Sequence, residues 1–176
     1  EVNPELVAVV PVPVAEQLQS AKSLSGGSVD AVAEGVAMDV RANPHRTYLF
    51  GPGSTVGTVE SELRIDGSPL GVDVWRDGEL LVADATEQQI LDNLSEDNVL
   101  VVSPIGGQGF VFGRGNPQFS PAVIRQCEVR IVASPSKIDQ LGQLRVDTDD
   151  PDLDEELQGW WRVRVGKYQT RLMQII

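Results

Sequence analysis

Apolar residues along this chain follow two spacings, which separate the predicted strands from the predicted helices. Short apolar runs at 6–10, 47–50 and 98–102 predict buried β-strands. Valines instead recur every three to four residues in a segment that Ser28 caps and Asn43-Pro44 ends. That spacing builds one apolar face and predicts an amphipathic helix.

Capping residues mark where the later helices begin. Thr86 and Gln89 form a capping box before an apolar helical stretch. At three further places a residue that can cap a helix precedes a proline at the first helical position. These places are Ser120-Pro121, Ser134-Pro135 and Asp150-Pro151.

The order of the elements predicts an α/β fold. Strands that alternate with helices favour a mainly parallel sheet with helices on both faces. Asp77-Gly78 is a strong hairpin signal, so we expect antiparallel hairpins at the edges of the sheet. No internal repeat or linker divides the chain, which predicts a single domain over 1–176. The other predicted strands lie at 70–75, 79–83, 129–133 and 144–147, with a closing antiparallel pair in 160–176.

Composition and charge exclude several classes of function. Hydrophobic residues make up 41% of the 176 residues, as in globular proteins. The net charge of −12 disfavours a nucleic-acid or anionic membrane partner, because both require a basic surface. With one histidine, His45, and one cysteine, Cys127, we expect neither a zinc site nor a Ser-His-Asp triad. We expect a cytoplasmic protein, since no signal-peptide pattern or membrane-spanning run is present.

The first candidate ligand-binding element is Gly51-Pro52-Gly53-Ser54-Thr55, which leaves a predicted strand and enters a predicted helix. Its turn offers free backbone N–H groups at the positive end of a helix dipole, and Ser54 and Thr55 add hydroxyls. Gly51, Gly53, Ser54 and Thr55 would then hold a phosphate. A tight turn with a serine or threonine cap has the same sequence, and both interpretations stay open.

The second candidate is the glycine-rich loop 103–120, which follows the most apolar strand. Five glycines fall within ten residues, more than a structural turn needs. Arg114 can pair bidentately with a phosphate or a carboxylate. We therefore predict a ligand-binding or active-site loop, with Phe110 and Phe112 packed in the core. If the two preceding strands are neighbours, both loops face one crevice. The predicted contacts in this loop are Gly106, Gly107, Gln108, Gly109, Arg114, Gly115 and Asn116.

Aspartates provide the weakest candidates. Asp73 interrupts a predicted strand, where a buried charge needs a partner, and Asp84 lies just before the Thr86 cap. Both are candidates for catalytic or metal-facing groups, although aspartate is also an ordinary residue of turns and caps. The acidic run 147–154 is most simply a solvated turn and helix start. A weak cation site stays open as an alternative, although the run lacks the glycine and the terminal glutamate of an EF-hand.

Several segments, in order, resemble the C-terminal half of the ATP-NAD kinase-like proteins, the predicted ATP- or polyphosphate-dependent branch related to the acetoin-catabolism X proteins. The resemblance runs from about Leu6 to the end of the chain. It departs at Ser103 where threonine is usual, Pro117 where glutamine is usual and Asp149 where glycine is usual. The matching segments are G-P-G-S-T, L-G-V-D-V-W-R-D-G-E-L, D-A-T-E, S-P-I-G-G-Q-G-F-V-F-G-R-G-N-P-Q-F-S-P and L-R-V-D-T.

The resemblance implies a nucleotide-binding protein of a family that transfers a phosphoryl group from ATP or polyphosphate to the 2′-hydroxyl of NAD. It implies Mg²⁺ with the phosphoryl donor, NAD as substrate, a homo-oligomer and an N-terminal domain in the full-length protein. NAD kinases carry G-G-D-G in that domain, and no G-G-D-G occurs in this sequence. The chain would then supply the binding half of a composite site and be inactive alone. Two alternatives stay open: a non-catalytic nucleotide sensor or assembly module, and a kinase of another small hydroxyl compound.

Overall fold

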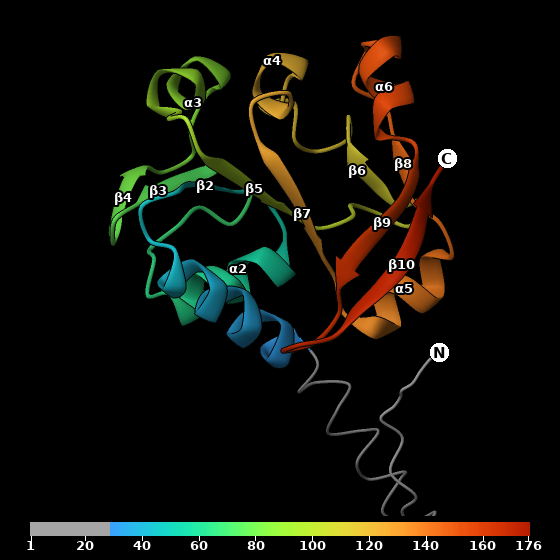
Figure 1. Cartoon of the computed structure of the whole chain (residues 1–176), viewed down its shortest axis with the longest axis horizontal. Helices are drawn as coiled ribbons and strands as arrows, with labels where there is room; N and C mark the ends of the chain where they lie inside the picture. Colours follow the sequence, from blue (N-terminus) through green and yellow to red (C-terminus); the bar gives the residue numbers. More distant parts are fainter. Residues whose placement is uncertain (1–28) are drawn as a thin grey trace, which may run out of the picture.

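A seven-stranded sheet forms the centre of the molecule, in the order β10-β9-β7-β5-β2-β3-β4 (Figure 1). The computed structural model describes residues 29–176, so the strand predicted at 6–10 and the cap predicted at Ser28 lie outside the described residues. Four neighbouring strands in the middle of this order pair in parallel. They are β2 (Thr47–Phe50), β5 (Asn98–Val102), β7 (Glu128–Val132) and β9 (Gly159–Arg164).

Antiparallel strands close both edges of the sheet. β3 (Asp73–Arg76) pairs antiparallel with β2 and with β4 (Glu79–Val82). The turn between β3 and β4 places Asp77-Gly78 in the left-handed region, as its sequence predicts. β10 (Thr170–Ile175) pairs antiparallel with β9. The fold class predicted from the sequence is therefore confirmed, including the hairpins at the edges.

Helices cover both faces of the sheet. In Figure 1, α2 and the helix at 29–42 lie on one side, and α3, α4 and α6 lie on the other. The predicted caps Thr86, Ser120, Ser134 and Asp150 all accept hydrogen bonds from the backbone of their helices. The helix bounds are α2 (Ser54–Glu62), α3 (Glu87–Asn93), α4 (Pro121–Ile124), α5 (Pro135–Leu141) and α6 (Pro151–Leu157). No helix in residues 29–176 is long and apolar enough to cross a membrane.

β5 is buried along its whole length and divides the core into two clusters. Val99 and Val101 pack in the cluster that includes α2 and the helix at 29–42. Leu100 and Val102 point to the opposite face and pack in the cluster that includes α3, α4, α5 and α6. Side chains alternate across a strand, so a strand covered on both faces reads as one continuous apolar run. This explains why the apolar run at 98–102 predicted a buried strand.

A small second sheet lies within the segment that the sequence pattern assigned to a loop. β6 (Phe110–Phe112) pairs in parallel with β8 (Arg145–Val146). The prediction of a loop over 103–120 was therefore wrong at residues 110–112, which form β6. Sequence periodicity could not reveal β6, because three residues between glycines are too few to show a period. Phe112 is only 1% exposed, as predicted for a core residue. The strand predicted from residue 70 begins only at Asp73.

The two-sided burial of β5 leads to a stability prediction. We expect Leu100→Ala to lower the free energy of unfolding by roughly 2–5 kcal/mol, because it removes a fully buried side chain from the centre of the sheet. Urea unfolding followed by circular dichroism measures the change. Leu70→Ala is the matched control, because Leu70 is 85% exposed and its truncation should change the stability by less than about 0.5 kcal/mol. Similar losses in the two variants would contradict this account of the core.

Candidate functional site

The two glycine-rich loops leave the same edge of the sheet. β2 and β5 are parallel neighbours, with Phe50 opposite Val101. The amide of Gly51 continues this pairing by donating a hydrogen bond to the carbonyl oxygen of Val101 at 2.9 Å. The carboxyl ends of both strands therefore coincide, and the segments 51–55 and 103–106 start side by side. The condition on which the predicted crevice depended is met.

A pocket of about 350 Å³ lies between these two segments. The N-terminal end of α2 forms one wall, and the start of the glycine-rich loop forms another. The beginning of α5 closes the pocket, because α5 follows β7, the neighbour of β5 in the sheet. The polar and glycine residues that line it are Gly53, Ser54, Thr55, Ser103, Gly106, Ser134 and Lys137.

The N-terminal end of α2 has no side-chain cap. Gly53 occupies the N-cap position at φ 118, a conformation that favours glycine, and no acidic residue lies in the first turn. The first N–H groups of a helix have no partner within the helix. The amides at Ser54 and Thr55 therefore add the positive end of the α2 dipole to the pocket wall. This end of α2 suits an anionic group.

Lys137 adds a positive charge to the same pocket. It is half-buried in the first turn of α5, where its own amide donates to the Ser134 hydroxyl at 3.3 Å. A cation in the first turn of a helix is unfavourable with respect to the helix dipole. Sequence reasoning missed this residue. The sequence did contain a signal for it. Lys137 is a lysine in a strongly acidic chain, and it lies three positions after a helix cap, on a helix that follows a predicted strand.

The segment Gly106-Gly107-Gln108-Gly109 forms a turn that projects from the loop. An antiparallel bridge closes it, with the Ile105 amide donating to the Phe110 carbonyl at 2.8 Å. Gly106, Gly107 and Gln108 are exposed, whereas Gly109 is buried and its carbonyl accepts from the Arg145 amide. Only Gly106 lines the pocket at α2. Gly107 and Gln108 line a neighbouring pocket of about 470 Å³ with Arg145.

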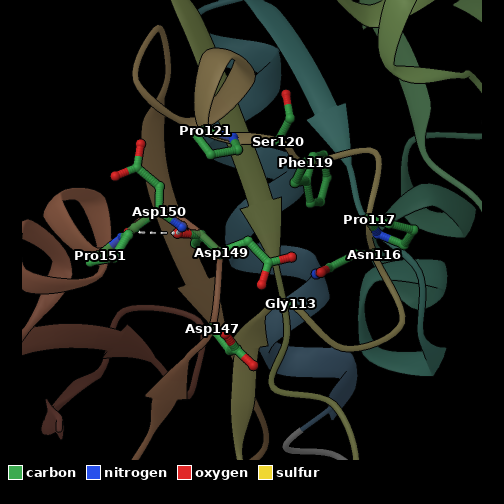
Figure 2. Close-up of a pocket in the computed structure, with 11 residues that line it drawn as sticks. Gly113, Asn116, Pro117, Phe119, Ser120, Pro121, Asp147, Asp149, Asp150 and Pro151 are labelled. Carbon is green, nitrogen blue, oxygen red and sulfur yellow. Dashed lines mark hydrogen bonds between the residues drawn. The ribbon is translucent and has the colours of Figure 1, made fainter.

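The rest of the loop lies against a third pocket, drawn in Figure 2. Arg114 stacks over the ring of Phe110, 4.5 Å from its centroid, and approaches Asp147 at 3.7 Å. Gly115 lies against Ile105, and Asn116 is fully buried. Of the predicted contact residues in this loop, Gly106, Gly107, Gln108 and Asn116 line these three pockets. Gly109, Arg114 and Gly115 line none of the three, and all contacts with a ligand stay predictions.

Asp73 lies at the same edge of the sheet, opposite Phe50, and is fully buried. Both of its carboxylate oxygens accept hydrogen bonds. Ser68 donates from its amide and its hydroxyl, each at 2.8 Å, and the amide of Asp84 donates at 3.0 Å. Asp73 thereby ties the segment before β3 to the segment after β4. Asp84 itself is exposed and adopts φ 53. These contacts favour a positioning role for Asp73, at the edge of the sheet from which both glycine-rich segments leave.

Glu60, on α2, is a second buried carboxyl group beside Asp73. It is 4% exposed, and its Oε2 has no hydrogen-bond partner among the described residues. Burial, with the adjacent carboxylate of Asp73, raises the pKa of Glu60 to about 9. The group is therefore protonated at neutral pH. Sequence reasoning missed Glu60, because one glutamate on a helix carries no sign that it faces inward.

Comparison with known protein families identified a matching family. A family model described as the ATP-NAD kinase C-terminal domain matches residues 44–175. No curated protein and no solved structure matches the chain. The matched range contains both glycine-rich segments, the β3–β4 hairpin and all the strands of the sheet.

The protonated state of Glu60 predicts a pH dependence of stability. Its pKa is about 9 in the folded chain and about 4.3 in the unfolded chain. The folded state then binds one more proton between these values, so the free energy of unfolding should fall as the pH rises through this window. The slope from this group is at most about 1.4 kcal/mol per pH unit. Urea unfolding between pH 6 and pH 8.5 measures it.

Glu60→Gln tests this prediction, because it keeps the shape of the side chain and removes the titration. We expect the variant to lose most of the pH slope and to be more stable than the wild type at pH 8.5. Glu62→Gln is the control, since Glu62 is an exposed residue of the same helix. An unchanged slope in Glu60→Gln would show that Glu60 ionises normally in the folded protein.

Proposed function

Because this chain belongs to the ATP-NAD kinase C-terminal domain family, we propose that it is the nucleotide-binding part of an NAD kinase-like phosphotransferase. In this proposal, the pocket between 51–55 and 103–106 binds a phosphate group of the nucleotide. Membership of the family supports the assignment to the kinases, and the chemistry of the pocket supports phosphate as the bound group.

The observation that carries the proposal is the charge of the pocket. The start of α2, whose first amides have no partner within the helix, lines this space together with the side-chain-bearing donors Ser54, Thr55 and Lys137. No aspartate or glutamate occurs among its described lining residues, although the whole chain carries a net charge of −12. Distant surface charges are screened within about 10 Å at 0.1 M salt, so the local donors decide what binds. An oxyanion such as phosphate satisfies this donor set.

The proposed reaction is transfer of a phosphoryl group from ATP or polyphosphate to the 2′-hydroxyl of NAD. The residues of this chain bind and orient the nucleotide: backbone amides near Gly53 and Gly106 donate to its phosphate oxygens, and Lys137 neutralises charge. The sequence contains no G-G-D-G motif, so the proposal assigns binding to these residues and no chemical step. We expect the isolated chain to bind a nucleotide without turning it over.

The donor set bears on the metal ion that such a reaction uses. Mg²⁺ prefers oxygen ligands, above all carboxylates and phosphates. The described lining of the phosphate pocket supplies amides, hydroxyls and an ammonium group, and residues 29–176 hold no group of three or more acidic, histidine or cysteine side chains suited to a metal. The residues of this pocket therefore do not fit a Mg²⁺ ion, and their proposed role is confined to holding the phosphate.

Lys137→Ala tests the proposed phosphate site. We expect titration calorimetry to detect binding of at least one of NAD, NADP and ATP to the wild-type chain. The variant should bind that nucleotide roughly 10- to 100-fold more weakly, because a hydrogen bond to a charged group contributes about 1.5–3 kcal/mol. Lys167→Ala is the matched control, since Lys167 pairs with Glu34 at 3.3 Å and does not line this pocket. It should bind as the wild type does.

Two results would contradict the proposal. The first is the absence of binding heat with all three nucleotides in a wild-type chain that is folded by circular dichroism. The second is an equal loss of affinity in the two lysine variants, which would indicate that a general change of charge, and not the pocket, governs binding.

A further inference from the structure

The pocket drawn in Figure 2 has a chemistry opposite to that of the phosphate pocket. It has a volume of about 570 Å³. One wall is the segment 113–121, and the other is the acidic segment 147–151. The two walls touch at Gly113, where an added Cβ would meet the carbonyl oxygen of Asp147 and where φ is 96. Only glycine fits this close approach.

Asn116 presents an unsatisfied acceptor to this pocket. Its side chain is fully buried, and its Nδ2 donates to the carbonyl of Val111 at 2.9 Å. That bond fixes the orientation of the carboxamide and leaves Oδ1 without a donor among the described residues. A buried acceptor without a donor is rare in folded proteins and costly. The position of Oδ1 therefore points to a donor supplied by a ligand.

Asp149 is the one aspartate of the opposite wall that has no partner in residues 29–176. Asp150 caps α6 and pairs with Arg125 at 2.8 Å, and Asp147 lies 3.7 Å from Arg114. No hydrogen bond or ion pair joins the Asp149 carboxylate to the described residues. Figure 2 shows this carboxylate and the carboxamide of Asn116 pointing toward one another across the pocket. A donor or a cation placed between the two groups would satisfy both acceptors.

The rest of the lining distinguishes an organic cation from a metal ion. A hard metal ion takes about six oxygen ligands at short range. Residues 29–176 contain no cluster of three or more acidic, histidine or cysteine side chains suited to one. The pocket is also far larger than an ion, and Pro117, Phe119 and Pro121 give it apolar surface. These residues suit the carbon body of a small molecule.

We propose that this pocket binds an organic amine. The ammonium group lies between Asn116 Oδ1 and the Asp149 carboxylate, and the apolar body contacts Pro117, Phe119 and Pro121. This site is separate from the phosphate pocket, and it does not depend on the proposed nucleotide-binding function.

Benzylamine is the probe for this proposal, because it joins an ammonium group to a flat apolar body. Titration of the ¹⁵N-labelled wild-type chain should give saturable shifts of the Asn116 side-chain and Gly113 backbone resonances. Benzyl alcohol, which has the same shape and no charge, should bind at least tenfold more weakly. Equal binding of the two compounds, or shifts that lie outside the pocket, would overturn the proposal.

Variants of Asp149 isolate the charge without disturbing the fold. Asp149 adopts φ 67, which glycine and asparagine both tolerate, so Asp149→Gly and Asp149→Asn should fold. Each should weaken benzylamine binding about three- to tenfold, the range for a partly exposed charged contact. Asp66→Asn, the same charge change at an exposed aspartate that does not line the pocket, should leave it unchanged. No loss in the Asp149 variants, or an equal loss in Asp66→Asn, would overturn the proposal.

Salts of Mg²⁺ and Ca²⁺ provide the last arm of the test. Each ion is added at about 5 mM, a concentration at which an oxygen-ligand site for that ion would be occupied. We expect neither ion to displace benzylamine or to shift the Asn116 side-chain resonances. Displacement by either ion at that concentration would assign the pocket to a metal and overturn the amine proposal.

Discussion

The parallel pairing of β2 with β5 is the contact on which the candidate sites depend. Both strands are covered on both faces, so their register is determined by two cores at once, and a shift of one residue would turn apolar side chains from one core to the other. The register brings Phe50 and Val101 side by side and ends both strands at one edge. Glycine-rich segments follow each strand there, where a sheet of this type places its ligands.

Buried carboxyl groups connect this edge of the sheet to the neighbouring β3–β4 hairpin. Asp73 lies opposite Phe50 and holds Ser68 and Asp84 through three hydrogen bonds. The amide of Gly53 in turn reaches the carbonyl of Pro69 at 3.4 Å. The uncapped start of α2 is thus supported by a segment that Asp73 fixes. Glu60 lies beside Asp73 in its neutral form, because burial disfavours its charged form and the adjacent Asp73 raises its pKa further.

The sequence predicted most of this fold, and its failures have identifiable physical causes. Continuous apolar runs predicted β2 and β5, and four cap residues predicted helix starts, because both signals are local. β6 was missed, since three residues between glycines show no period, and its pairing with β8 depends on residues more than thirty positions away. The site prediction named the glycines and Asn116, whose residue types are informative, and their contacts with a ligand stay predictions. It missed Lys137 and Glu60, since only the packing of α5 and α2 shows which way a lysine or a glutamate faces.

One loop separates two pockets that suit groups of opposite charge. This separation follows from where the backbone of the loop turns. Its start, at Ser103 to Gly106, faces the amides of α2 and Lys137, whereas its end, at Gly113 to Asn116, faces the acidic segment before α6. The net charge of −12 cannot account for both, because it would favour cations everywhere. Helix starts, one lysine and one unpartnered carboxamide oxygen act over a few ångströms, at which screening by solvent is weakest. The glycines allow the turns that keep these two environments apart.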